Sequence, residues 1–350
     1  MSNSLFNFAD NNFTNMRRLF LYIIVAGVCI MTSCSRNPLD VDVSDIDADV
    51  RVERFDQEFY ACSEDVSFST VGKLAEKYPL FFDLYNSHVI SCGSYSDQSY
   101  YQCLKVFFSD YSVVEAYNAV NKEFADCSDV QGTLNEGFRH LLYYYPDEEL
   151  PRVVTFVAGF NQSVVLMDGY VGIGLDKYLG VDCSLYSMLQ IPEFAKREMQ
   201  RNQIPIDVMS EWFRDRHPYK PETENLVNTM IYNGMLLYFL EAMFPNMPEA
   251  DRLMYSSEEL DYCRHFERDM WTSLIENGYL FTTDVFTIRK FTENAPFTAP
   301  FGQECPARVA NWTGLQIVKA YVKNNNVSLT ELLEETDYQK VLNLSEYNPK

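Results

Sequence analysis

Val153-Val-Thr-Phe-Val157 and Val164-Val-Leu-Met167 decide the fold class of this 350-residue chain, because they interrupt a sequence that is otherwise helical in its periodicity. β-Branched and aromatic residues of this kind favour extended strands. Residues 158–163 separate the two runs and contain Gly159 and Asn161, which can turn the chain. This stretch therefore predicts a β-hairpin.

A glycine-rich stretch, residues 169–180, continues the strand pattern. Gly172-Ile-Gly174 has the spacing that opens a dinucleotide-binding fingerprint, but Lys177 stands where the third glycine belongs and no helix signal follows. We interpret these glycines as positions that permit a bulge or a close backbone contact.

Helical patterns flank the predicted strands on both sides. Residues 71–126 and 134–144 have helical periodicity, with a kink or helix boundary at Pro79. Residues 223–244 are apolar on several faces, which predicts a buried helix that Pro245 stops.

Two capping boxes and one short strand complete the predicted fold, which is α+β, predominantly helical, with a small antiparallel β-hairpin or sheet. The alternation in residues 50–60 indicates a strand that changes phase near Arg54. Ser256 with Glu259 and Ser328 with Glu331 each predict the start of a helix. The first of these helices carries one apolar stripe (Leu260, Cys263, Phe266, Met270 and Leu274) and ends at Asn277-Gly278, and the last two helices begin near Trp312 and Ser328.

The composition limits the classes of function. A formal net charge of −22 repels nucleic acid, so a nucleic-acid partner is excluded. With 47% apolar residues the chain can build a packed core. We expect one domain over residues 50–350.

The N-terminal sequence predicts a bacterial lipoprotein signal. Arg17 and Arg18 precede an apolar run, residues 19–31, that is too short to span a membrane. Met31-Thr-Ser-Cys34 then has the pattern of a lipobox, so residues 1–33 are a signal peptide, and Met16 is the favoured start. Cys34 would carry acyl chains such as palmitate, which anchor the protein to a membrane. An ordinary cleaved signal and a simple anchor helix are the alternatives.

Residues 34–49 are expected to form an acidic tether, because aspartates recur at close spacing without a helical stripe. The first acid, Asp40, lies well after Cys34. Lipoproteins exported to the surface tend to carry acids closer to the lipid. The expected location is therefore the periplasmic face of the outer membrane, with surface exposure as the alternative.

No catalytic or metal-binding motif is evident, so we predict no catalytic residue, no metal and no cofactor. The four histidines do not form an H-E-x-x-H motif, and there is no G-x-S-x-G elbow. Seven cysteines follow Cys34, and disulfides and free buried thiols both remain open for them. The aromatic residues are typical of a core, with a glycan-binding groove as the alternative. An acidic cluster in the middle of the chain reads as a solvated face: Glu193, Glu198, Asp207, Glu211 and Asp215.

Five stretches in order resemble one family, the gliding-motility lipoproteins called GldB. The stretches are residues 172–180, 230–241, 294–298, 309–321 and 344–349, and the resemblance runs from about Arg51 to the end of the chain. The family motifs fall on positions whose role is unknown: Asp176, Tyr178, Asn233, Gly234, Trp312 and Gly314. The sequence departs from the family pattern at Ala307 and Ala310, where glycine is usual, and at Asn233, where an ionisable residue often stands.

This resemblance implies an envelope-anchored lipoprotein of Bacteroidetes-type bacteria, a non-catalytic accessory component linked to gliding motility and to protein secretion machinery. Its partners would be the membrane, through the lipid, and other envelope proteins. The family is also distantly similar to zinc-dependent peptidases, which implies a degenerate zincin-like scaffold. In those enzymes an acidic zinc ligand would occupy the position of Asn233, and neutral asparagine is a poor ligand for Zn²⁺. The alternatives are a degenerate or cryptic metallopeptidase-like hydrolase and a carbohydrate-binding lipoprotein.

Overall fold

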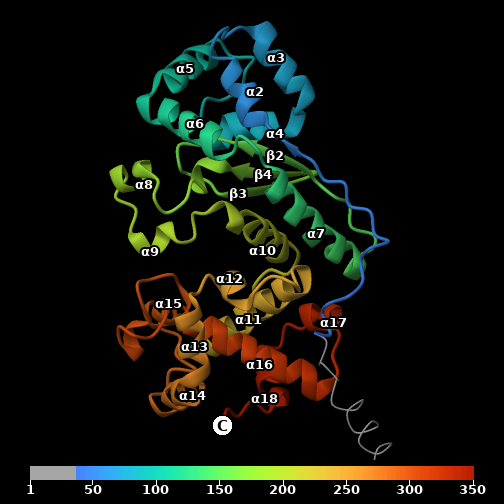
Figure 1. Cartoon of the computed structure of the whole chain (residues 1–350), viewed down its shortest axis with the longest axis vertical. Coiled ribbons are helices and arrows are strands. Elements are labelled where there is room, and N and C mark those ends of the chain that lie inside the picture. Colours follow the sequence, from blue (N-terminus) through green and yellow to red (C-terminus); the bar gives the residue numbers. More distant parts are fainter. Residues whose placement is uncertain (1–36) are drawn as a thin grey trace, which may run out of the picture. The chain divides into compact units, whose positions relative to one another are not determined.

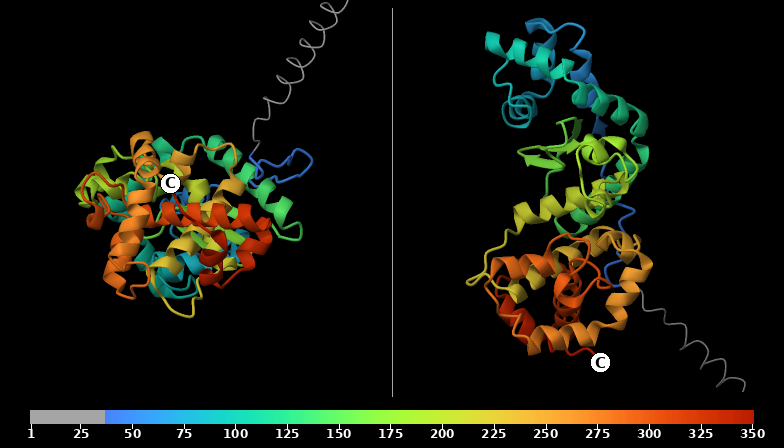
Figure 2. Two further views of the ribbon diagram at one scale, coloured as in Figure 1. Left: turned by 90° about the horizontal axis from the view of Figure 1, so that it is seen from below. Right: turned by 90° about the vertical axis from the view of Figure 1, so that its left-hand side faces the viewer.

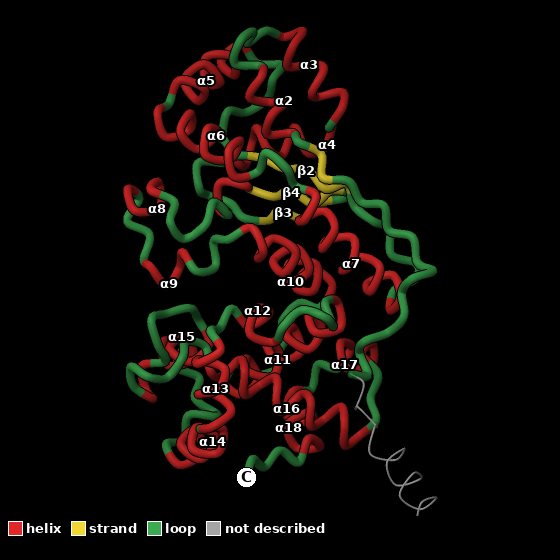
Figure 3. The backbone as a smooth tube through the Cα atoms, viewed as in Figure 1, coloured by secondary structure: helices red, strands yellow, loops and turns green. Residues whose placement is uncertain are grey.

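The computed structural model describes residues 37–350, and the predicted signal peptide and Cys34 lie outside the described residues. Residues 42–350 form one compact unit, to which the following description applies. Figures 1 and 3 show many helices around one small sheet, which confirms the predicted helical α+β fold. Among the described residues, no helix combines the length and the apolar character needed to cross a membrane.

The sheet has four strands in the order β1-β2-β4-β3. β1 pairs with β2 and β2 pairs with β4 in parallel, whereas β3 and β4 are antiparallel. The strands are β1 (Val52–Glu53), β2 (Arg152–Phe156), β3 (Val164–Met167) and β4 (Tyr170–Gly174).

The predicted hairpin between 153–157 and 164–167 is wrong in its pairing, because β4 lies between those two strands. The tight turn at Asp168-Gly169, with Gly169 at a φ of +73°, instead joins β3 to β4. Gly174 shows why these glycines are needed: an added Cβ would lie 2.1 Å from the carbonyl oxygen of Gln162. The close backbone contact that we inferred for this stretch is confirmed.

The predicted strand over residues 50–60 is correct only for Val52 and Glu53. From Phe55 the chain is helical, since Phe55 and Phe59 are one helical turn apart and both are fully buried. The other N-terminal helices agree with the predicted periodicity, and α4 begins at Pro79. These elements are α2 (Phe55–Ala61), α3 (Phe68–Lys77), α4 (Pro79–Leu84), the π-helix η1 (Tyr85–Val89), α5 (Gln98–Ser109), α6 (Tyr111–Glu123) and α7 (Ser128–Tyr144).

An aromatic core joins these helices to one face of the sheet. The ring of Phe55 lies 5.0 Å from that of Phe81 and 5.1 Å from that of Tyr85, and Tyr85 packs against Phe156 of β2. A disulfide between Cys92 and Cys103 closes the loop before α5. In Figures 1 and 2, helices α2–α6 lie on one side of the sheet, and α7 and α10 lie on the other.

The middle of the chain is a series of short helices that leads into α10. Leu179 forms an isolated bridge with Gln200, which closes this segment into a loop. The elements are the 3-10 helix η2 (Leu175–Lys177), α8 (Ser184–Met188), α9 (Glu193–Lys196), η3 (Arg201–Gln203) and α10 (Ile204–Arg216).

The C-terminal part is entirely helical, and its centre is the crossing of α11 and α16. Helix α11 is buried on nearly all faces and ends just before Pro245, as predicted. Both predicted capping boxes are present. The stripe after Ser256 is divided between two helices at Phe266, and the prediction missed the last helix, α18. The elements are α11 (Leu226–Met243), α12 (Glu249–Leu253), α13 (Ser257–His265), α14 (Glu267–Glu276), α15 (Val285–Thr292), η4 (Ala299–Phe301), α16 (Val309–Asn325), α17 (Leu329–Glu334) and α18 (Tyr338–Ser345).

Candidate functional site

The carboxyl ends of the three parallel strands bring polar residues together at one end of the sheet, where these strands stop. Asp56 follows β1, the turn of Ala158 to Phe160 follows β2, and Asp176 follows β4. In open α/β sheets, ligands bind outside the carboxyl ends of parallel strands, and the three parallel strands of this mixed sheet share that geometry. We therefore take the region at these strand ends as the candidate functional site.

Asp56 is a fully buried carboxylate held by fixed partners. Arg54 donates to both of its oxygens, at 2.9 Å from Nε and 2.8 Å from a terminal nitrogen. The hydroxyl of Thr155 donates to the same carboxylate at 2.5 Å. Because its charge is paired, Asp56 fastens β1 to β2 and has no free oxygen for chemistry.

Asp176, one of the family-motif positions, is also fully buried but lacks a cationic hydrogen-bond partner. Its Oδ2 accepts hydrogen bonds from the backbone N–H groups of Ala158, at 3.2 Å, and Phe160, at 2.5 Å. Within the described structure its Oδ1 has no hydrogen-bond partner. Burial raises the pKa of Asp176 to about 6, against the opposing effect of the two N–H donors.

The turn that Asp176 holds has an unusual backbone. Gly159 and Phe160 both have a φ of +68°, and Phe160 carries a side chain that disfavours this conformation. The two hydrogen bonds to Asp176 offset this cost, so the carboxylate fixes the turn after β2.

Two buried tyrosines extend the polar cluster beside Asp176. The hydroxyl of Tyr85 donates to the carbonyl of Val157 at 2.7 Å, and the hydroxyl of Tyr117 interacts with that of Tyr85. Burial raises the pKa of both tyrosines well above its usual range, and the negative charge of Asp176 adds to this effect. Both hydroxyls therefore stay protonated.

Tyr178, the second motif residue of this stretch, connects η2 to α10. Its hydroxyl donates to Oδ2 of Asp207 at 2.6 Å. Burial raises the pKa of Asp207 to about 6, and the neighbouring charge of Glu198 acts in the same direction. Glu198 in turn lies 2.8 Å from a guanidinium nitrogen of Arg308 at the start of α16.

These contacts change the interpretation of the acidic cluster. Asp207 is held by Tyr178, and Glu193 forms an ion pair at 2.6 Å with the buried Lys196. Glu211 and Asp215 keep substantial exposure, as expected of a solvated face. The prediction of a solvated face therefore holds for Glu193, whose side chain stays largely exposed, and for the end of α10, and it fails for Asp207.

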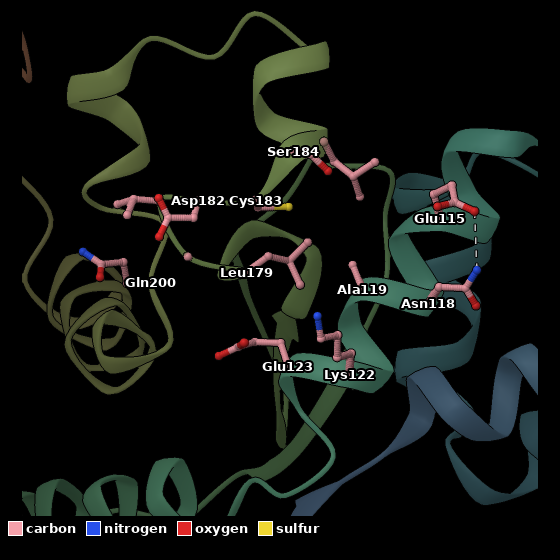
Figure 4. A pocket seen from close by; sticks show the side chains of 13 residues that line it. Glu115, Asn118, Ala119, Lys122, Glu123, Leu179, Asp182, Cys183, Ser184 and Gln200 are labelled. Carbon is pink, nitrogen blue, oxygen red and sulfur yellow. Dashed lines mark hydrogen bonds between the residues drawn. The ribbon is translucent and has the colours of Figure 1, made fainter.

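A surface cavity of about 650 Å³ adjoins the strand-end edge, between α6 and the segment after η2. Figure 4 shows Lys122 and Glu123 on the α6 side and Asp182 and Cys183 across from them. The lining mixes acidic and basic groups around backbone and small side chains. Lys122 is the one basic residue of this lining, beside Glu115, Glu123 and Asp182.

The remaining motif positions lie at the crossing of α11 and α16, away from the strand-end cluster in the chain. Asn233 donates through Nδ2 to Oδ1 of Asn311 at 2.9 Å, and Gly234 faces Gly314. Trp312 is buried in a cluster with residues of α12 and α13. These four motif residues therefore serve helix packing in this structure.

The two alanines that depart from the family pattern fit the same region. Ala310 is buried, and the carbonyl of Ala307 accepts a hydrogen bond from Tyr255 at 2.6 Å. Sequence reasoning did not identify Asp56, Tyr85 or Tyr117. Only Asp56 left a signal, as an acid just after the change of phase that the sequence indicates near Arg54.

Among residues 37–350, no group of histidine, cysteine, aspartate and glutamate side chains is arranged to hold a metal ion. The fold and the strand-end cluster together define a helix-rich α+β domain in which buried acids hold the loops that follow the strands. The chain belongs to the family of gliding motility protein GldB, whose model matches residues 36–349. Comparison with curated proteins and with solved structures gives no significant match.

This membership makes the chain a gliding-motility lipoprotein of the cell envelope. Its partners belong, in general, to the proteins of that envelope.

Proposed function

We propose that this protein is a non-catalytic accessory component of the envelope machinery for gliding motility and protein secretion, and that it works by binding other envelope proteins. The observation that carries the proposal is the family match over nearly the whole chain. A protein of this kind needs a stable scaffold with open surfaces rather than a reactive centre.

The contacts of the motif residues support a structural role. Asn233 stands where the zinc-dependent peptidases that the family distantly resembles would have an acidic ligand, and its amide donates to Asn311. Asp176 is bonded to the turn after β2, and Tyr178 to Asp207. Each of these side chains is engaged in holding two parts of the fold together.

The anchor and the domain layout belong to the same proposal. Residues 1–33 would be removed, Cys34 would carry the lipid, and residues 34–49 would tether a single domain, residues 50–350. The late position of Asp40 favours the periplasmic face of the outer membrane. Labelling with a clickable fatty acid tests this: wild type should be labelled and Cys34→Ala should not. Equal labelling of the two proteins would rule out this anchor.

The experiment for the function is co-purification of the anchored protein from the envelope. We expect wild type to recover a reproducible set of envelope proteins, with Cys34→Ala recovering fewer because it is released from the membrane. Recovery of the wild-type protein only as a solitary monomer would contradict the proposal.

A hydrolase is the second candidate, and one observation favours it. Asp176 and Asp207 are carboxyl groups with a pKa of about 6, a value suited to general acid–base catalysis near neutral pH. Elemental analysis of protein purified without chelators separates the candidates. Stoichiometric zinc would favour the hydrolase and overturn the non-catalytic proposal.

A further inference from the structure

The outer strands of the sheet, β1 and β3, differ in whether other parts of the chain bond to their outward backbone groups. At the β1 edge, side chains of α7 bond to the outward backbone groups. The N–H of Val50 donates to Asn135 at 2.8 Å, the N–H of Val52 donates to Gln131 at 3.0 Å, and the amide of Asn135 donates to the carbonyl of Val50 at 3.0 Å. This edge is closed to another strand.

At the opposite edge, β3 has no such cover. Within the described residues, every hydrogen bond of its backbone goes to β4. The N–H of Gly174 donates to the carbonyl of Ser163 at 2.7 Å, which sets the alternation of bonded and non-bonded pairs along the hairpin. In this register Val164 and Leu166 direct their N–H and C=O groups outward.

The sequence of β3 contains none of the residues that usually protect an exposed strand from pairing. All four of its residues are uncharged and half-buried, and none is proline. Natural sheets protect exposed edges with charged side chains, proline or a covering element. An open apolar edge of this kind recognises extended peptides by adding them as a further strand.

The surroundings of β3 are acidic, which sets the charge of the partner. Helix α10 lies beside β3, as Figure 1 shows, and carries the exposed acids Glu211 and Asp215 one helical turn apart. Arg214 pairs with Glu211 at 2.6 Å, and Arg216 lies 3.7 Å from Asp215, so these charges are partly balanced.

A cavity of about 420 Å³ opens where the hairpin turn meets the end of α10. Leu166, one of the two residues with outward backbone groups, lines it together with the Trp212 ring. Its charged lining residues are mainly acidic: Glu148, Glu149, Asp168 and Asp215, with Arg216 bonded to Glu148 at 2.6 Å. The indole N–H of the buried Trp212 also donates to Glu148, at 3.1 Å, so the other three carboxylates are the groups that suit a basic side chain.

We propose that an extended segment of a partner protein pairs with the outer edge of β3 and places a lysine or arginine side chain in this cavity. The inference rests on the proposed function and specifies the partner's chemistry. A second copy of this chain fits less well, because the β3 hairpin that it would add, residues 164–169, carries no basic side chain for the cavity.

The test uses the full lipoprotein in detergent micelles and two fluorescent heptapeptides. Both peptides alternate valine and threonine; one carries an arginine near its end, and the other has glutamate at that position. We expect fluorescence anisotropy to show saturable binding of the arginine peptide, with the glutamate peptide about tenfold weaker. Equal binding of both peptides, or no binding of either, overturns the inference.

Leu166→Pro removes one outward N–H and leaves the hydrogen bonds of the hairpin in place. We expect it to weaken the arginine peptide about tenfold, whereas the matched control Leu166→Ala keeps the N–H and should bind within about threefold of wild type. Circular dichroism checks that both variants fold. Should Leu166→Pro not fold, the same peptide with an N-methyl group on its pairing face replaces it, and undiminished binding of that peptide overturns the inference.

Co-purification distinguishes a failure of the edge-strand site from a failure of the proposed function. If wild type recovers envelope proteins and folded Leu166→Pro recovers the same set in full, the proposed function stands and the edge-strand site is wrong. If wild type recovers nothing, the proposed function itself fails. A wild-type dimer that Leu166→Pro dissociates would assign the edge to a second copy and also overturn the inference.

Discussion

The crossing of α11 and α16 provides a direct test of the fold. Gly234 on α11 and Gly314 on α16 face each other where the helices meet. A Cβ atom on Gly314 would lie 1.8 Å from the carbonyl oxygen of Met230, and one on Gly234 would lie 2.3 Å from the carbonyl carbon of Gly314. Both obstacles are backbone atoms, so no side-chain rotation relieves the clash.

The expected loss of stability follows from the distance between the added Cβ atom and the carbonyl oxygen of Met230. Ordinary contact begins at 3.4 Å, so Gly314→Ala requires α16 to move by roughly 1.5 Å relative to α11. A gap of that size removes much of the dispersion energy between the two helices, which are buried over most of their length. We expect the free energy of unfolding to fall by about 3 kcal/mol or more, at the upper end of overpacking effects.

Urea unfolding followed by circular dichroism measures this change. Gly72→Ala is the matched control, because Gly72 lies within α3 and a Cβ there meets nothing within 4 Å. The control should gain roughly 0.5–1 kcal/mol from its helix propensity. Failure of Gly314→Ala to fold, with a folded control, would agree with the prediction. A loss below about 1 kcal/mol would refute the close crossing.

Three further predictions concern the sheet and its surroundings. The pKa of Asp176 rises from its ordinary value of 3.8 to about 6 in the folded protein. The folded state therefore binds the proton more tightly than the unfolded state, and the free energy of unfolding falls as the pH rises from about 4 to about 6. Asp176→Asn should therefore gain up to about 3 kcal/mol over wild type between pH 4 and pH 7 in urea unfolding, and a constant difference would contradict this. Cys92→Ser opens the disulfide to Cys103 and should cost roughly 2–3 kcal/mol. Wild type with reductant should then melt like the variant, and unequal melting would count against the disulfide. Asn135→Ala leaves two backbone groups of Val50 unpaired, so thermal melting should show a loss of about 2 kcal/mol, whereas a loss under about 0.5 kcal/mol would argue against the closed edge.

Sequence predicts those parts of the fold that depend on local physical chemistry. Proline cannot continue a helix, so Pro79 and Pro245 mark helix boundaries in the structure where the sequence placed them. Ser256 and Ser328 cap helices because the hydroxyl and the glutamate three residues later satisfy unpaired N–H groups. None of these features requires knowledge of distant residues.

Strand order and the state of the buried acids depend on distant residues. The runs at β2 and β3 are neighbours in sequence, but pairing β2 with β4 completes a parallel arrangement that no local pattern encodes. No local sequence pattern separates Asp176 and Asp207 from nearby exposed acids such as Asp182 and Asp215. Their environment is set by residues distant in sequence: the turn after β2 contacts Asp176, and Tyr178 contacts Asp207.

The motif residues and the proposed recognition residues have different roles: the first stabilise the fold, and the second line the cavity beside β3. Gly234 and Gly314 hold the helical part together, and Asp176 holds the strand-end turn, so substitutions there act first on the fold. Leu166 and Asp215, which line the cavity beside β3, lie outside the motif stretches. Because side chains in the cavity can change without disturbing those buried contacts, one scaffold can present cavities of different charge to different partners. On the edge-strand proposal, the charge of the cavity beside β3, rather than the motif residues, determines which partner this chain accepts.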